Sequence, residues 1–356
     1  MKKLKVCVFF VIVAVACIGS VKYRIESLEA QEKEVEIIRE NTERVQAERE
    51  AKKREEEDKK SKIELLLPGF ICWGDSLTVG VGGEGVTYPI ILQRLIKENV
   101  YDIPVKNMGV SNENAVTVSA RAGSLAFSIY GLTIPSERTP VRIRFKSING
   151  HALMPLRQEK TGINPVTIEG IEGTLTISQD SSYSDEYQYY FTRSTAGEET
   201  QILDDMELHI ASAGLYNKYI PIIAIGENGG YVDYNDLITQ IHAIAEQHDT
   251  NGKYIVLGIT IGTDDTNTVL EDTMRSEFGQ KYINLRKYLC ESGLEDCGIT
   301  PTEEDEDNIL IGRVPASLRS DDIHLNSYGY TAVAQGIYER MERLGYFEEI
   351  FSILAE

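Results

Sequence analysis

Hydrophobic and polar positions follow several different patterns along this chain. Residues 6–21 read "VCVFFVIVAVACIGSV", an almost unbroken apolar run, and residues 22–62 are nearly all charged or long polar side chains. From Ile63, continuous apolar segments alternate with segments whose apolar residues recur at helical spacing. A two-residue alternation replaces this pattern over residues 122–213, and the earlier pattern then resumes. The chain therefore divides into four parts, with predicted boundaries at 1–21, 22–62, 63–121 together with 214–356, and 122–213.

The two outer segments of the body predict an α/β domain. "FICWG", "VKNMG", "YIPIIAIG" and "KYIVLGIT" each indicate a short buried strand, and "TYPIILQRLIKEN" and "YNDLITQIHAIAEQH" indicate amphipathic helices. Strands that alternate with helices predict a parallel sheet covered on both faces. Functional side chains are expected beyond the carboxyl ends of its strands.

The middle segment, residues 122–213, predicts an inserted β-rich domain. "PVRIRFKSI", "VTIEGIEGTLTI" and "YQYYFTR" alternate at period two, with Gly or Pro between them, as short antiparallel strands do. Tyr187, Tyr189 and Phe191 share one strand face, which could stack on sugars or be an ordinary half-buried face. Because the insert separates two segments expected at the site, we expect it to leave from that end of the sheet and to form one wall of a cleft.

The N-terminal segment, residues 1–21, indicates export. The apolar run approaches the ~20 residues of a spanning helix. Lys2, Lys3 and Lys5 precede it, and these basic residues favour an orientation with the N-terminus inside. Three interpretations stay open: an uncleaved signal anchor, a cleaved signal peptide, and lipid attachment at Cys17. The predicted location is the cell membrane, single-pass with the body outside, or secretion if the segment is cleaved.

Residues 22–62 predict a helical stalk. They contain no Pro or Gly, and helix-forming residues dominate. Leu28, Val35, Ile38 and Val45 approximate a heptad seam, although polar residues interrupt it. Weak coiled-coil self-association of the stalk is the alternative to a solitary helix.

The net charge limits the classes of partner that are expected. The formal net charge is −20; residues 1–62 hold 15 basic and 13 acidic residues, which leaves 21 and 43, or −22, for the body. Such an acidic body argues against nucleic acid and against charge-driven binding to an anionic membrane.

The acidic run at residues 303–307 lacks the spaced ligands and Gly of a calcium loop and predicts a solvated loop. Cys290 and Cys297 could form a local disulfide or remain free thiols.

Polar residues at predicted strand ends and in a late loop supply the candidate chemistry. Ser76 follows "FICWG", Gly109 ends "VKNMG", and Asn228 follows "YIPIIAIG". Of the five histidines, His324 alone has a carboxylate, Asp321, three residues earlier in a loop. This spacing lets Asp321 accept from one ring nitrogen while the other faces Ser76, which is what a hydroxyl nucleophile needs. The backbone N–H groups of Ser76 and Gly109 and the Asn228 amide could stabilise an oxyanion.

The order of these motifs resembles the SGNH hydrolases, also called the GDSL esterase/lipase family. The resemblance covers about residues 63–121 and 215–356, and not the stalk or the insert. The matching blocks are Gly74-Asp75-Ser76-Leu77, Asn107-Met108-Gly109, Gly226-Glu227-Asn228 and Asp321-Asp322-Ile323-His324.

The resemblance implies a flavodoxin-like three-layer fold, no metal or other cofactor, and a Ser-His-Asp ester hydrolase or acyl transferase. It implies that Ser76 is the nucleophile, His324 the general base and Asp321 the residue that orients it. Ser76, Gly109 and Asn228 would form the oxyanion hole. The third block departs from the usual Gly-x-Asn-Asp, because Gly229 follows Asn228 here, and a looser loop is expected. No substrate-binding residue is assigned.

The predicted function is an exported, membrane-anchored serine esterase that removes acyl groups, acetyl above all, from a carbohydrate or cell-envelope glycan. The expected partner is thus an acylated small molecule or glycan. The carbohydrate part depends on location and on family precedent for β inserts. A lysophospholipase, a general carboxylesterase and an O-acyltransferase would use the same triad. The alternative from another class is a degenerate, non-catalytic hydrolase that binds a glycan or a protein.

Overall fold

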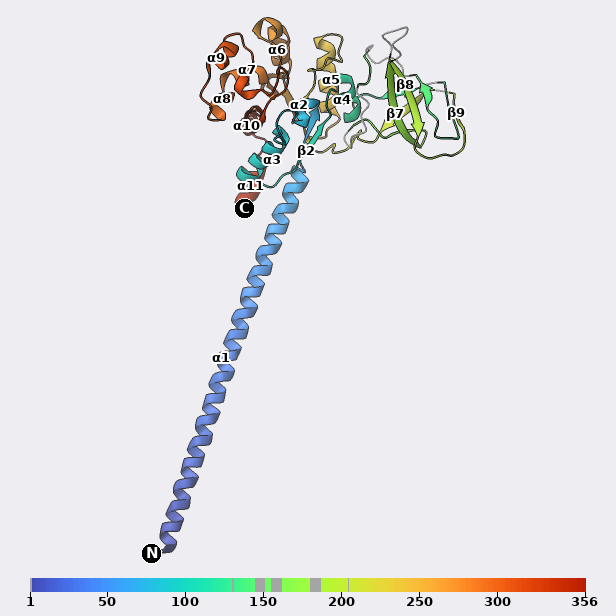
Figure 1. Ribbon diagram of the computed structural model, residues 1–356. Helices are drawn as coiled ribbons and strands as arrows, with labels where there is room; N and C mark the ends of the chain where they lie inside the picture. The colour runs from blue at the N-terminus through green and yellow to red at the C-terminus, as the bar shows by residue number, and fades with distance from the viewer. Residues whose placement is uncertain (1, 130, 145–150, 155–161, 180–186, 204) are drawn as a thin grey trace. The chain divides into compact units, whose positions relative to one another are not determined.

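The chain forms two compact units, residues 1–62 and 63–356, which are described separately. The computed structural model (Figure 1) describes residues 2–129, 131–144, 151–154, 162–179, 187–203 and 205–356. Of residues 2–8, 179 and 187, only the backbone is described.

The first unit is helical throughout. It belongs to α1 (Lys2–Leu66), and exposed ion pairs one turn apart, such as Arg39–Glu43, line its surface. Each such pair adds only about 0.3–0.5 kcal/mol, so the helix depends mainly on its run of good helix formers. No helix among the described residues is long and apolar enough to cross a membrane. The expected N-terminal membrane helix is therefore not supported, and the expected self-association of the stalk stays a prediction.

A five-stranded parallel sheet forms the centre of the second unit. Its order is β13-β12-β11-β1-β2, which is the 2-1-3-4-5 order of flavodoxin-like sheets when its strands are numbered along the chain. Gly74 at the end of β1 lies opposite Gly109 of β2 and Ala224 of β11. The expected α/β class with a parallel sheet is confirmed. The strands are β1 (Phe70–Gly74), β2 (Val105–Gly109), β11 (Ile220–Ala224), β12 (Ile255–Leu257) and β13 (Tyr282–Ile283).

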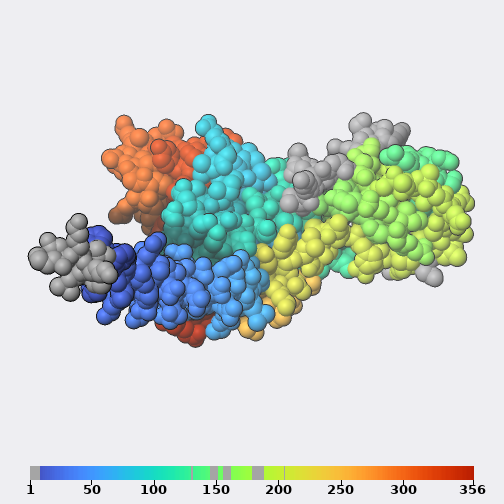
Figure 2. All heavy atoms as spheres, turned by 90° about the horizontal axis from the view of Figure 1, so that it is seen from below, coloured from blue at the N-terminus to red at the C-terminus, as the bar shows by residue number. Residues whose placement is uncertain are grey.

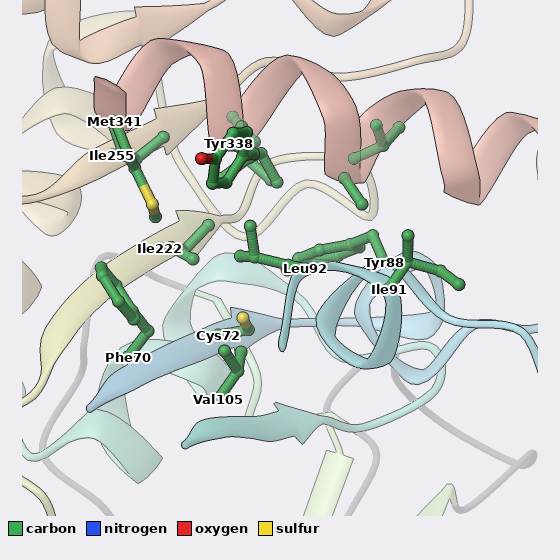
Figure 3. Packing of buried hydrophobic residues seen from close by; sticks show 14 of the residues in the cluster. Phe70, Cys72, Tyr88, Ile91, Leu92, Val105, Ile222, Ile255, Tyr338 and Met341 are labelled. Atoms are coloured by element: carbon green, nitrogen blue, oxygen red, sulfur yellow. The ribbon is translucent and has the colours of Figure 1, made fainter. Parts of the chain in front are cut away.

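Helices cover both faces of this sheet because its strands are apolar on both faces. Cys72 packs with Leu92 of α3 and Met341 of α10 on one face (Figure 3), and Trp73 packs with α4, α5 and α6 on the other. The helices are α2 (Ser76–Val79), α3 (Tyr88–Asn99), α4 (Ala115–Ala122), α5 (Tyr234–Glu246), α6 (Asp264–Phe278), α7 (Leu285–Glu291), α8 (Gly293–Asp296), α9 (Glu303–Leu310), α10 (Ser327–Arg343) and α11 (Glu348–Ala355), with short 3-10 turns η1 (Gly279–Lys281) and η2 (Ala316–Leu318).

Antiparallel strands occupy the chain between α4 and β11 and gather into one lobe, green to yellow in Figure 2. A six-stranded sheet has the order β3-β10-β6-β7-β8-β5, and β4 pairs with β9. These strands are β3 (Phe127–Ile129), β4 (Leu132–Ile134), β5 (Val141–Ile143), β6 (Val166–Ile168), β7 (Ile171–Gln179), β8 (Tyr187–Arg193), β9 (Thr200–Ile202) and β10 (Met206–Ile210). Phe191 is fully buried in their core, and Tyr189 packs against it and accepts a hydrogen bond from the N–H of Leu153. Phe191 is therefore a core residue and Tyr189 is half-buried against that core, whereas the side chain of Tyr187 lies outside the described part.

Helix α4 belongs to both cores. Val116 and Ala120 pack among the antiparallel strands, while Val118 and Ala122 pack against the parallel sheet. The Ser212 hydroxyl donates to the carbonyl oxygen of Arg121 at 3.0 Å, so the ends of the β-rich segment meet beside α4.

In the last third of the chain one expectation is corrected, and one of two open alternatives is observed. The acidic run at residues 303–307 is not a loop: it begins α9, where Thr302 and Asp305 form a reciprocal capping box and acidic side chains favour the positive end of the helix. Cys290 and Cys297 are free thiols that contact different carbonyl oxygens, those of Arg313 and Tyr328.

Candidate active site

Ser76 lies at the turn between β1 and α2, and this short helix fixes its place. Asp75 caps α2: its Oδ1 accepts from the N–H of Leu77 at 3.0 Å, and its carbonyl oxygen accepts from Thr78 and Val79. Asp75 is thus a helix cap, and the residue after it presents a hydroxyl at the carboxyl end of β1. Ser76 is 7% exposed, so its hydroxyl is partly shielded from water.

His324 connects Ser76 to Asp321. Its Nε2 lies 3.1 Å from Oγ of Ser76, and its Nδ1 lies 2.8 Å from Oδ2 of Asp321. Ser76 and His324 are 248 positions apart in the sequence. The three residues named for the triad therefore form one continuous hydrogen-bonded chain.

A tight loop sets the Asp321–His324 geometry. Oδ1 of Asp321 accepts from the backbone N–H of Ile323 at 2.8 Å and of His324 at 2.7 Å. The backbone bond from His324, with the other bonds in the loop, lowers the pKa of Asp321 to about 2. Asp321 is thus a carboxylate at neutral pH, and it holds the proton of His324 on Nδ1. Nε2 is then free to accept from the Ser76 hydroxyl.

Two of the three donors named for the oxyanion hole already have acceptors. The N–H of Gly109 donates to Oδ1 of Asn107 at 2.9 Å. The Asn228 amide donates to Oδ2 of Asp75 at 3.1 Å and to the carbonyl oxygen of Glu113 at 3.0 Å. Both residues lie at the strand ends around Ser76, but they could donate to an oxyanion only after exchanging these acceptors.

Glycines allow the backbone segments of the site to approach one another. A Cβ on Gly109 would lie 2.4 Å from the backbone nitrogen of Val79, so only glycine lets β2 end this close to α2. The glycines after Asn228 do not leave their loop unsupported. Ala115 donates to the carbonyl oxygen of Gly229, and the side chain of Gln240 donates to that of Gly230, each at 2.9 Å.

A buried carboxyl group, Asp75, and a half-buried one, Glu227, lie beneath the site. Asp75 and Glu227 line a cavity of about 20 Å³, room for one water molecule, whose other walls are mostly apolar. Burial raises the pKa of Asp75 to about 6. Burial, and then the charge of Asp75, raise the pKa of Glu227 to about 7. Glu227 accepts from the backbone of Thr260 and Ile261, which fixes the end of β12 to the Asn228 loop.

A fully buried arginine joins the strand ends. Nε of Arg121 pairs with Glu113 at 2.6 Å, and its Nη atoms donate to the carbonyl oxygens of Met108 at 2.8 Å and Gly74 at 3.2 Å. Sequence reasoning missed Arg121, although a single charged residue in the apolar helix "AVTVSARA" is a usable signal. It also missed that Asp75 accepts a hydrogen bond from the Asn228 amide, because the two residues are far apart in the sequence.

The β-rich segment returns to the site edge. It leaves the chain after α4, between the Gly109 and Asn228 segments. Its residues 152–154 nevertheless contact the start of α4: the Asn114 amide donates to the carbonyl oxygen of Ala152 at 2.8 Å. Asn114 is adjacent to Glu113, whose carbonyl oxygen accepts from Asn228.

Comparisons with known proteins add no relative. Neither protein-family models, nor curated proteins, nor solved structures gave a match to this chain. Among the residues that the structure describes, no group of three or more His, Cys, Asp or Glu side chains could hold a metal ion. Function is therefore inferred from the sequence motifs and from the geometry above.

Proposed function

We propose that this chain is an SGNH-type serine hydrolase that cleaves carboxylic esters through an acyl-enzyme. The hydrogen-bonded chain Ser76–His324–Asp321 is the single observation that carries the proposal. Ser76 lies far from Asp321 and His324 in the sequence, yet the three side chains form hydrogen bonds in the donor and acceptor order that nucleophilic catalysis requires.

Each group has a defined task in this reaction. His324 Nε2 takes the proton from Ser76 as Oγ attacks the ester carbonyl carbon, and Asp321 stabilises the resulting imidazolium. Collapse of the tetrahedral intermediate breaks the bond to the leaving alkoxide, which takes the proton from His324. Water, deprotonated by the same nitrogen, then attacks the acyl-enzyme and releases the acid and free Ser76.

In the free protein, two of the three proposed oxyanion donors have other acceptors. The backbone N–H of Ser76 is available at the start of α2, and Gly109 and Asn228 would turn from Asn107, Asp75 and Glu113 toward the substrate. An oxyanion accepts hydrogen bonds more strongly than a neutral carbonyl, which favours this exchange over the Glu113 contact.

The substrate proposed is a short-chain ester, such as acetyl, on a carbohydrate. The proposal depends on the predicted export and on the β-rich segment whose residues 152–154 lie against α4 beside the Asn228 loop. A lysophospholipase, general carboxylesterase or O-acyltransferase would use the same three residues. Export and membrane attachment are proposed from the sequence alone, and fractionation of cells that express the full chain tests them.

A non-catalytic binding protein is the second candidate, because one observation favours it. Gly109 and Asn228 both have acceptors other than a substrate oxyanion. If these bonds persist, the site is closed to ester chemistry although its triad is intact.

A fluorophosphonate probe distinguishes the two candidates. We expect the full chain to be labelled, the Ser76→Ala variant not to be labelled, and an exposed control on α11, Ser352→Ala, to be labelled like the parent. The same three proteins are then assayed with p-nitrophenyl acetate and with longer esters. A folded parent that is neither labelled nor active would reject the hydrolase and favour the non-catalytic binding protein. Acetate hydrolysis that persists in Ser76→Ala would reject Ser76 as the nucleophile.

A further inference from the structure

Two arginine side chains face the loop that carries Asp321 and His324. Nη2 of Arg313 lies 2.7 Å from Oδ1 of Asp322, and Nη1 of Arg319 lies 3.6 Å from the same oxygen. Asp322 is thus not simply solvated, as its position beside Asp321 first suggests, but lies between two guanidinium groups. Its own side chain is 89% exposed, so it leaves this position at little cost.

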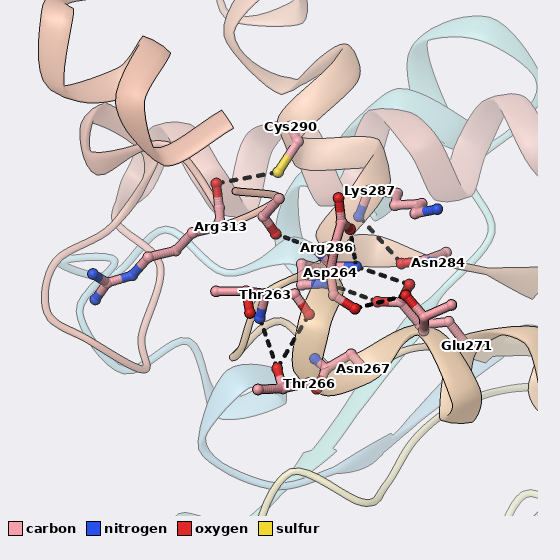
Figure 4. A network of polar contacts seen from close by, with 12 residues as sticks. Thr263, Asp264, Thr266, Asn267, Glu271, Asn284, Arg286, Lys287, Cys290 and Arg313 are labelled. Carbon is pink, nitrogen blue, oxygen red and sulfur yellow. Dashed lines mark hydrogen bonds and ion pairs between the residues drawn. The ribbon is translucent and has the colours of Figure 1, made fainter. Parts of the chain in front are cut away.

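The backbone holds both arginines rigidly. Arg313 donates its N–H to Asn308 and accepts from Cys290, and Arg286 donates to the carbonyl oxygen of the preceding Gly312. Figure 4 shows the Arg313 side chain extending away from Arg286, while its carbonyl oxygen faces Cys290. Arg319 pairs across the loop with Leu325, and its Nε donates to Val314 at 2.9 Å. The Arg319 guanidinium is therefore held by a group that is not part of the triad, and the backbone from which the Arg313 side chain extends is fixed.

Most of the donor capacity of this pair is unused. Each guanidinium carries five N–H donors. Among the described residues, the side-chain hydrogen bonds and ion pairs of the two arginines lead only to Val314 and Asp322. Arg319 is only 12% exposed, and burial together with Arg313 lowers its pKa. Asp322 pairs with both cations, so an anion that displaces it meets two positive charges.

The pair lies close to the reacting groups. A small hollow is lined by both arginines, by Asp322, and by Ile323 and Leu325, which flank His324. The Cα atoms of Asp322 and His324 are separated by two peptide units, and so by at most about 7.6 Å. An anionic group bound here therefore lies against the loop that carries His324.

We propose that Arg313 and Arg319 bind an anionic group of the substrate, a carboxylate or a phosphate ester, and that Asp322 occupies this site in the free protein. The substrate class becomes an acylated acidic glycan in place of a neutral one, so this inference rests on the proposed esterase function. The guanidinium fork matches pairs of oxygens on a carboxylate or a phosphate, and the contact is stronger than a neutral hydrogen bond.

Three matched sugars test the proposal with the full chain. They are acetylated methyl glucoside, acetylated methyl glucuronoside and acetylated methyl glucoside 6-phosphate, which differ in a hydroxymethyl, a carboxylate and a phosphate ester. We expect the ratio of kcat/KM for an anionic sugar over the neutral sugar to be about ten or more. It should fall toward one in Arg313→Gln, rise in Asp322→Asn, and decrease with added NaCl. The larger of the two anionic ratios identifies the group.

A purely structural role for the pair gives a different result. If Asp322 only fastens the loop, Arg313→Gln and Asp322→Asn lower kcat for all three sugars alike and leave the ratio unchanged, which would overturn the inference. Arg275→Gln, an exposed arginine of α6, is the control and leaves the ratio as in the parent.

A binding measurement separates this inference from the esterase proposal. Calorimetry compares unacetylated methyl glucuronoside and methyl glucoside 6-phosphate with methyl glucoside. Weaker binding of the preferred anion to Arg313→Gln than to the parent supports the site even if no ester is cleaved. Equal binding of all three sugars to the parent contradicts it.

Discussion

At the scale of single residues, Asp321 and Asp322 are adjacent but have different partners. Asp321 accepts from the ring and the backbone of His324, whereas Asp322 contacts Arg313 and Arg319. The loop bonds that lower the pKa of Asp321 keep it ionised, and an ionised carboxylate specifies which ring nitrogen carries the proton. Asp321 thus controls whether Nε2 faces Ser76 as an acceptor.

Replacing Asp321 by Asn should preserve the loop and reverse the tautomer. The Asn amide can donate to Nδ1, which leaves the proton on Nε2, so that His324 no longer accepts from Ser76. We expect kcat to fall by roughly 10²–10⁴ with little change in KM. Asp307→Asn, an exposed residue of α9, serves as the control. Parent-like kcat in Asp321→Asn would show that another group orients the histidine.

The carboxyl groups of Asp75 and Glu227 make stability depend on pH. Because burial raises their pKa values to about 6 and about 7, the folded protein binds more protons than the unfolded chain between about pH 4 and pH 7. Their contribution to stability is therefore present on the acidic side and is lost as pH rises through these values. Asp305 and Asp321 have pKa values of about 2 and act only below this interval.

The free energy of unfolding should accordingly decrease between pH 5 and pH 8 through these two groups. For Glu227 the change is on the order of 3 kcal/mol. We expect Glu227→Gln to flatten the slope, measured by urea unfolding at each pH, whatever its effect on absolute stability. The exposed Glu304→Gln should keep the parent slope. Equal slopes in all three proteins would place the linkage elsewhere.

At the scale of elements, Arg121 of α4 connects the ends of β1 and β2. Its guanidinium reaches the carbonyl oxygens of Gly74 and Met108, immediately before the nucleophile turn and before Gly109. Its charge is balanced by Glu113, which is equally buried. A buried pair of this kind is costly to break, because the partner left behind is a charge without water.

Arg121→Met should destabilise the protein by about 3–5 kcal/mol. The double variant Arg121→Met/Glu113→Gln should recover part of that loss, because it removes the charge left behind. Urea unfolding at pH 7 provides the measurement. A double variant less stable than the single variant would mean that Glu113 contributes through contacts other than Arg121.

Sequence patterns predicted the elements with local signals and missed those stabilised by distant contacts. The strand "FICWG" and the helix over Tyr88–Asn99 follow from apolar spacing alone. The acidic helix α9 was missed because its net charge suggests a solvated loop. The Thr302 cap and the burial of Asp305 against Ser317 outweigh that charge, and Ser317 is twelve residues away. The triad was predictable from motif order, but the acceptors of Gly109 and Asn228 were not, because they depend on packing between separate strands.

At the scale of the whole molecule, the border between the two units crosses α1. Ile63 is 1% exposed and packs in the core against the parallel sheet, while Leu65, two residues later, is 82% exposed. The last turn of the long helix therefore belongs to the body, although its first sixty residues do not.

Ile63→Ala in the full chain should cost about 2–5 kcal/mol of stability, and Leu65→Ala should cost almost nothing. A chain that begins at Ile63 should unfold at the same urea concentration as the full chain, because it keeps every residue of the body core. Loss of stability in that truncation, with Ile63 present, would indicate that residues 1–62 support the body.

Helix α4 has a consequence for how this protein can be taken apart. Its Val116 and Ala120 are wedged among the antiparallel strands while its Val118 and Ala122 lie on the parallel sheet. Excising residues 122–213 and splicing the ends would strip one flank of this helix and expose it to water. The β-rich lobe therefore cannot be removed or exchanged without α4. Recombination or protein engineering that exchanges it has to transplant α4, and Arg121 with it, as part of the same piece.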